Sequence, residues 1–156
     1  MRVFRLLFIL AILFVVVGCQ PLANATKELT VLKQFNQCRF VEPEIRLIEN
    51  EAQLASLIIF PLGRAGGLDE LRYYFKTYHV ALIAMGQKPS TGYSIAVGSS
   101  TIDVKRGVAM LPVKFVQPSA KRMSASVITS PCIVFAVEKT GYDKIKVGET
   151  GLSLLM

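Results

Sequence analysis

From residue 79 onward the chain consists of short apolar runs separated by glycine, proline and polar residues. The runs are four to nine residues long, which is the usual length of β-strands and shorter than most helices. Strands at this spacing, with Gly and Pro between them, are typical of β-sandwiches and small barrels. We therefore predict a mainly β fold: a small sandwich or barrel of about seven strands with one or two short helices before it. The predicted strands are residues 80–85, 93–97, 101–105, 108–116, 124–128, 133–137 and 144–147.

The part of the chain before residue 79 has a mixed pattern. Residues 31–40 alternate in places and predict a first strand. Asn50 is a typical helix N-cap because Gln53 follows three residues later, ahead of apolar residues that share one helical face. Pro61 ends this short helix, and residues 68–75 predict a second helical turn or two.

The first eighteen residues have the pattern of an export signal. Arg2 and Arg5 precede twelve apolar residues, 6–17, a stretch too short for a comfortable membrane span. Residues 16–19, Val-Val-Gly-Cys, resemble a lipobox, with Val where Leu is commoner at the first of these positions. This resemblance implies that residues 1–18 are a lipoprotein signal peptide, removed so that Cys19 becomes the first residue.

A lipobox also implies lipid on Cys19: a diacylglycerol thioether, with an acyl chain such as palmitate on the new amino group. Two or three chains, at about 0.8 kcal/mol for each buried methylene, make a stable membrane anchor. Gln20 stands where Asp is linked with retention in the inner membrane. We therefore expect a lipid-anchored protein of the cell envelope, in the outer membrane and facing the periplasm. The alternative is an uncleaved anchor in which Cys19 remains a buried thiol.

The remaining 138 residues are enough for one compact domain. We expect residues 19–28 to be a lipidated tether, 29–75 an N-terminal mixed segment and 76–156 the β domain. The mature chain has 16 basic and 11 acidic residues, a net charge of +5 without a run of four basic residues. Spread in this way, the charge excludes a nucleic-acid groove, and it is typical of a solvated surface.

Two cysteines remain once Cys19 carries lipid. Export places Cys38 and Cys132 in an oxidising compartment, where an even pair predicts a disulfide. The alternative is one buried thiol and one exposed thiol.

The sequence offers little catalytic chemistry. His79 is the one histidine, and a Cys132–His79 dyad would require a free thiol at Cys132. The carboxylates are scattered, and no spacing among them indicates acid–base catalysis or a metal site. We therefore expect no enzyme, no catalytic residue, no metal and no cofactor.

One segment carries a family resemblance. Residues 80–85 are an apolar run, and Gly-Gln-Lys-Pro-Ser-Thr-Gly-Tyr follows at residues 86–93. Later, Thr-Ser-Pro-Cys at residues 129–132 precedes the apolar run Ile-Val-Phe-Ala-Val. In order and spacing, residues 75–140 resemble the C-terminal domain of PrcB-type protease-complex subunits, a family of exported lipoproteins. The chain departs from that pattern at Thr91, where many members have Gly, and at Cys132.

The resemblance implies a membrane-anchored, non-catalytic accessory subunit that binds or stabilises a secreted protease complex. It places the expected partner contacts on Lys88, Pro89, Ser90, Thr91, Gly92, Tyr93, Ser130 and Pro131.

Two other functions fit the same residues. Residues 89–93, Pro-Ser-Thr-Gly-Tyr, are similar to the Asn-Pro-Thr-Thr-Gly-Tyr loop of chagasin-type cysteine-peptidase inhibitors, which are exported Ig-like β-sandwiches. Two further loops of that family contain a Gly in one case and an Arg and an aromatic residue in the other. Here residues 116–122 lack the Gly, and residues 130–132 lack both the Arg and the aromatic residue. The third function is a structural envelope lipoprotein, in which Pro89 and Gly92 only turn a corner between strands.

The lipobox generates a direct prediction. Cys19→Ala removes the thiol that accepts lipid, so metabolic labelling with palmitate should fail and the unprocessed precursor should accumulate. A processed, soluble Cys19→Ala protein, or a wild type that takes up no label, would contradict the lipoprotein assignment.

Overall fold

A computed structural model describes residues 24–59, 69–119, 123–148 and 150–156 and confirms the mainly β fold. The predicted signal peptide, Cys19 and Pro61 lie outside the described residues. The described strands are β1 (Ala25–Phe35), β2 (Glu44–Ile48), β3 (Tyr78–Ala84), β4 (Ser94–Val97), β5 (Thr101–Lys105), β6 (Val108–Leu111), β7 (Val113–Val116), β8 (Cys132–Glu138), β9 (Lys144–Val147) and β10 (Ser153–Leu155). The helices are α2 (Glu51–Leu57), the short 3₁₀ turn η2 (Asp69–Leu71) and α3 (Arg72–Thr77).

Eight strands form one sheet in the order β10-β9-β6-β5-β1-β8-β3-β2, and β4 and β7 form a separate ribbon. All neighbours in the sheet are antiparallel except β6 and β9, which are parallel. The sheet curls until its end strands, β10 and β2, lie close together, so it is nearly a closed barrel. Its interior is filled by apolar side chains from every wall, with Phe135, Ile102, Ile145 and Leu111 among the largest.

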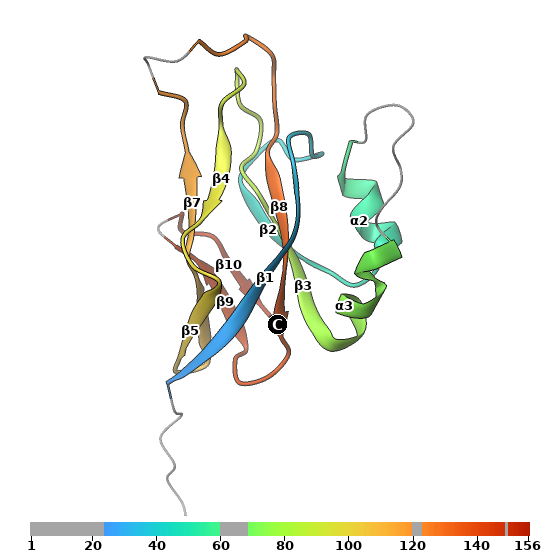
Figure 1. The fold of residues 1–156 in the computed structure, drawn as a ribbon, viewed down its shortest axis with the longest axis vertical. Helices are drawn as coiled ribbons and strands as arrows, with labels where there is room; N and C mark the ends of the chain where they lie inside the picture. Colours follow the sequence, from blue (N-terminus) through green and yellow to red (C-terminus); the bar gives the residue numbers. More distant parts are fainter. Residues whose placement is uncertain (1–23, 60–68, 120–122, 149) are drawn as a thin grey trace, which may run out of the picture.

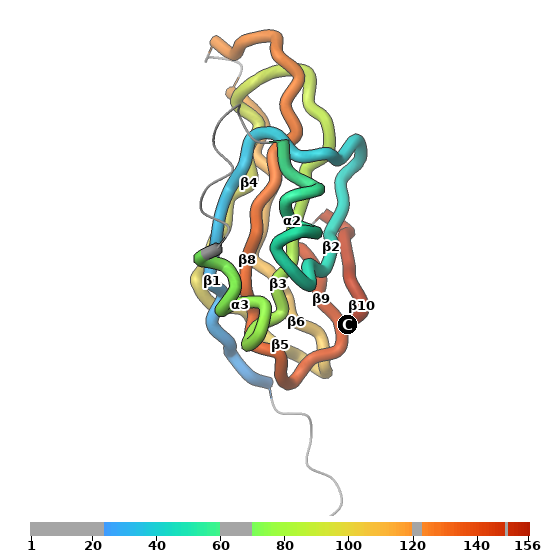
Figure 2. The backbone as a smooth tube through the Cα atoms, turned by 90° about the vertical axis from the view of Figure 1, so that its right-hand side faces the viewer, coloured from blue at the N-terminus to red at the C-terminus, as the bar shows by residue number. Residues whose placement is uncertain are grey.

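Strands β3 and β8 are buried on both faces. Alternate residues of β3, such as Ala81 and Ile83, face the barrel interior, while Val80 and Leu82 face a second apolar cluster. Helix α2 supplies Leu54 to that second cluster, and Figure 2 shows α2 and α3 lying over this side of the sheet. Two-sided burial explains why the sequence of both strands is continuously apolar instead of alternating.

The N-terminal boundary of helix α2 agrees with the prediction. Asn50 is its N-cap, and the Asn50 side chain accepts a hydrogen bond of 2.9 Å from the Gln53 backbone N–H. Gln53 also reaches back past the N-cap, since its side-chain oxygen accepts from the Glu49 N–H at 2.7 Å. The predicted second helix corresponds to η2 and α3.

Strands β4 to β7 are one long hairpin with a kink. Residues 94–97 pair with 113–116, and residues 103–105 pair with 108–110, in registers that differ by three. The kink falls at Pro112 and at residues 98–100, where proline and glycine interrupt the ladder. The predicted strand 108–116 is therefore divided into β6 and β7. Below the kink, β5 pairs with β1, whereas above it β4 does not (Figure 1).

Several predicted boundaries differ from the structure. Residues 124–128 form no strand: their side chains are exposed, and the segment is held by hydrogen bonds to loops instead of a ladder. Strands β2 and β10 were not predicted. Strand β1 begins at Ala25, inside the range 19–28 assigned to the tether, and it ends before Cys38. The sheet has no boundary at residue 75, because β1 and β2 pair with β8 and β3.

Cys38 and Cys132 form the predicted disulfide, with their Cα atoms 6.2 Å apart. Cys38 lies three residues after β1, and Cys132 is the first residue of β8. Both are buried in the cluster between the sheet and the helices. The bond therefore joins the chain that leaves β1 to the next strand of the sheet.

Removal of this bond should lower stability strongly. The two cysteines are 94 residues apart. Without the cross-link the unfolded chain gains conformational entropy, which predicts about 4.7 kcal/mol of destabilisation in a Cys38→Ala/Cys132→Ala variant. Urea unfolding of the variant and of oxidised wild type measures the difference. An unchanged urea midpoint in the variant would contradict the disulfide. So would alkylation of both thiols in unreduced wild type.

Candidate functional site

The segments that carry the resemblance meet residues 36–43 at one end of the molecule. Residues 36–43, the turn 86–93 and residues 123–131 lie at the end opposite the start of β1 (Figure 1). We call this group of segments the distal end. The barrel positions it, because β1, β3 and β8 run along the molecule and these segments continue from their distal ends.

Hydrogen bonds fix the turn to the segment that precedes β8. The Lys88 N–H donates to the Thr129 carbonyl at 2.7 Å, and the Thr129 N–H donates back to the Lys88 carbonyl at 3.0 Å. The Thr91 N–H donates to the Ala125 carbonyl, and the Ala125 N–H donates to the Thr91 hydroxyl. The Thr129 hydroxyl donates to the Ser90 carbonyl at 3.0 Å. The turn is therefore held on one side along most of its length.

Ser130 and Pro131 connect this pair of segments to residues 36–43. The Ser130 hydroxyl donates to the Phe40 carbonyl at 2.9 Å, and the Cys38 N–H donates to the Ser130 carbonyl at the same distance. The Met85 N–H donates to the Pro131 carbonyl at 2.9 Å. Both side chains are buried, so they support the surface from beneath.

Two glycines allow the turn to pack closely. Gly86 has a φ of +74°, and a Cβ on it would lie 2.7 Å from the backbone of Val41 and Glu42. Gly92 has a φ of +93°, and its Cβ would lie 2.9 Å from the Pro118 side chain. These positions need glycine both for the left-handed conformation and for the space.

The exposed part of the turn is smaller than the predicted contact set. Pro89 and Gly92 are exposed, and Lys88, Ser90, Thr91 and Tyr93 are half-buried. The Tyr93 ring packs against the barrel core. A pocket of about 280 Å³ lies beside Tyr93, lined also by Asn36, Gln37 and Val127.

Exposed apolar side chains surround the turn. Val41 is 65 % exposed, Ile128 63 % and Val127 54 %, and Met123 is fully exposed. Gln37 holds Ile128 in place by donating from Nε2 to its carbonyl at 3.0 Å. The sequence pattern assigned residues 124–128 to a strand, so it did not predict this apolar surface. The sequence feature that could have indicated the surface is the position of residues 124–128, directly before the Thr-Ser-Pro segment.

The structure contradicts a Cys132–His79 dyad. Cys132 is in the disulfide, and His79 pairs with Val137 near the opposite end of β8. The His79 ring instead packs edge-on against Tyr142, with centroids 5.8 Å apart. Burial, reinforced by the Lys139 charge, lowers the pKa of His79. Burial also raises the pKa of Tyr142, whose hydroxyl has no hydrogen-bond partner among the described residues.

Within residues 24–59, 69–119, 123–148 and 150–156, no three His, Cys, Asp or Glu side chains gather in a way that could hold a metal ion. Within them also, no helix has the length and apolar character needed to cross a membrane.

Gly86→Ala tests the packing of the turn against residues 41–43. Overpacking against backbone adds roughly 1–3 kcal/mol to roughly 1–2 kcal/mol of positive-φ strain, so we expect about 3 kcal/mol of destabilisation. Gly151→Ala is the matched control, because Gly151 has a φ of +78° but no atom within 4 Å of its Cβ position. Urea unfolding should show a clearly smaller loss in the control. Equal losses would contradict the close packing.

Comparison with protein families agrees with this geometry. Residues 79–138 match the model of the family described as PrcB C-terminal. No curated protein and no solved structure matches the chain. The matched range extends from the start of β3 to the end of β8 and includes the turn and the Thr-Ser-Pro segment. Residues 79–138 are therefore similar to the PrcB C-terminal domain. The rest of the chain adds β1, β2, β9 and β10 to the same sheet.

Proposed function

We propose that this protein is a membrane-anchored lipoprotein of the cell envelope and a non-catalytic accessory subunit of a secreted protease. The distal end is its partner-binding surface. The match of residues 79–138 to the PrcB C-terminal family supports the class of function. The observation that carries the proposal is the position of the exposed apolar side chains at the end opposite the start of β1.

The orientation follows from β1. This strand has eleven residues and spans roughly 35 Å at about 3.3 Å per residue. With lipid on Cys19, five residues separate the anchor from Ala25. The start of β1 then lies close to the membrane, and the distal end projects away from it, where a secreted partner is accessible.

The distal end is also suited to protein binding by its composition and rigidity. Val41, Val127 and Ile128 give apolar area, and Lys88 gives a cation at its centre. The hydrogen bonds of Lys88, Thr91 and Ser130 fix the loops before binding. A preorganised surface loses less entropy on association, which favours affinity.

The experiment is crosslinking in membranes followed by purification of the lipoprotein and identification of captured peptidases by mass spectrometry. Val41→Glu/Ile128→Glu places two charges in the apolar surface and should reduce peptidase capture at least tenfold, because burying unpaired carboxylates opposes binding. Both positions are exposed, so the melting temperature should stay within error.

Leu155→Glu is the matched control, since Leu155 is 75 % exposed and lies on β10, away from the distal end. It should retain capture. Loss of capture in the control as well, undiminished capture in the distal variant, or no captured peptidase would contradict the proposal. Inhibition of a papain-like peptidase by the purified protein would favour the inhibitor function instead.

A further inference from the structure

The barrel wall is open between β1 and β4. Residues 25–28 of β1 pair with residues 101–104 of β5, and the Leu29 N–H donates to the Ser100 carbonyl at 2.7 Å. Beyond that bond the kinked hairpin leaves β1, and among the described residues no backbone hydrogen bond joins β1 to β4. We call the gap between residues 29–37 and residues 91–100 the β1–β4 seam.

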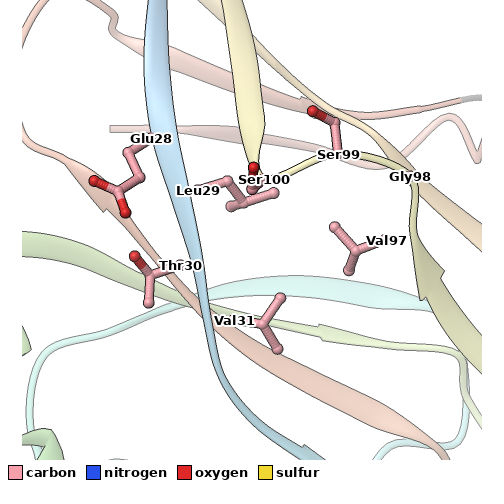
Figure 3. A pocket seen from close by; sticks show the side chains of 8 residues that line it. All are labelled: Glu28, Leu29, Thr30, Val31, Val97, Gly98, Ser99 and Ser100. Atoms are coloured by element: carbon pink, nitrogen blue, oxygen red, sulfur yellow. The ribbon is translucent and has the colours of Figure 1, made fainter.

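The exposure of Val31 shows that the seam is open. Leu29 and Val31 lie on the same side of β1, as strand alternation requires. Leu29 is 4 % exposed and belongs to the barrel core, whereas Val31 is 46 % exposed. Figure 3 shows Val31 and Val97 pointing toward each other across a pocket of about 450 Å³. No strand from the described part of the chain covers the core at this point.

The Gln34 side chain crosses the middle of the seam. Gln34 donates from Nε2 to the Ile95 carbonyl at 2.9 Å. This carbonyl lies on β4, on the edge away from β7, so a side-chain amide satisfies an acceptor that a neighbouring strand would otherwise satisfy.

The Gln34 bond also indicates the width of the seam. A glutamine side chain reaches roughly 5 Å from Cα to its amide nitrogen, by ordinary bond lengths. With the hydrogen bond added, the separation of the two backbones is at most roughly twice the 4.8 Å spacing of paired strands. An extended chain is therefore the widest element that the seam can take, and an α-helix, about 10 Å across, does not fit.

The seam is continuous with the distal end. At its upper limit, Asn36 and Gln37 face Gly92 and Tyr93 across the second pocket. Hollows therefore lie at both ends, with the Gln34 bond between them. A segment that docks on the exposed turn reaches the seam without a break in the surface.

We propose that the β1–β4 seam binds an extended segment of the partner protein by β-augmentation. This inference rests on the proposed function and names how the partner is held. The segment takes the position of a missing strand, and its N–H groups replace the Gln34 amide at the Ile95 carbonyl. Alternate side chains enter the barrel beside Leu29 and Val97, so the segment has apolar residues at every second position and no proline between them.

The test uses the mature lipoprotein in detergent and, as probe, a phage-displayed library of random dodecapeptides. Enriched peptides should be proline-free with alternating apolar residues, and their synthetic forms should protect the amides of Val31 and Val97 in hydrogen exchange. Val31→Trp fills the opening and should weaken peptide binding, so that the dissociation constant rises at least tenfold. Val116→Trp is the control, an exposed valine on β7 outside the seam, and should change it less than twofold.

Three results would overturn the inference: no enrichment over detergent micelles, equal binding by Val31→Trp, or protection confined to other strands. Ultracentrifugation could also show that the wild type is a dimer and that Val31→Trp is a monomer. This result would overturn the inference, because the seam would then bind a second copy of this chain. The peptidase capture assay separates this inference from the proposed function. Capture that survives Val31→Trp but not Val41→Glu/Ile128→Glu leaves the proposed function intact and excludes the seam.

Discussion

Strand β1 is hydrogen-bonded along one edge to β5 and along the other to β8, and the rest of the sheet depends on this double pairing. The family-matched residues 79–138 contain both neighbours but not β1 itself. Without β1, two long apolar edges would face each other unpaired, which proteins avoid. The Cys38–Cys132 disulfide secures the same junction, because it bonds the chain just beyond β1 to the first residue of β8.

The same strand sets the polarity of the molecule. It begins at the end where the chain enters the domain and ends at the turn-bearing distal end (Figure 1). Its two halves have different neighbours: residues 25–28 pair with β5, whereas residues 29–35 pair with β8, and at Val31 the other edge faces β4 across a gap. The first half connects β1 to β5, and the second half leaves a strand edge beside the exposed loops. A partner that meets the loops therefore meets an available strand edge as well.

The local sequence predicted the strands in which exposed and buried side chains alternate. Residues 101–105 and 144–147 were predicted with their observed bounds, because every second residue faces the barrel core. Residues 124–128 were wrongly assigned to a strand. Their apolar side chains face solvent, and Thr91 and Gln37 hold their backbone by side-chain hydrogen bonds. Composition cannot distinguish an apolar loop exposed at a surface from a buried strand of equal length.

The sequence alone determined the mainly β fold, the N-cap at Asn50, the cysteine pair and the glycines of the turn, because each depends on residues close in sequence or on the chemistry of the compartment. Only the tertiary structure decided that β1 separates β5 from β8, that Ser130 and Pro131 lie beneath the turn, and that β4 leaves β1 at the kink. These features depend on pairings between residues tens of positions apart. Their register is set by how whole strands pack around one core, which no local pattern encodes.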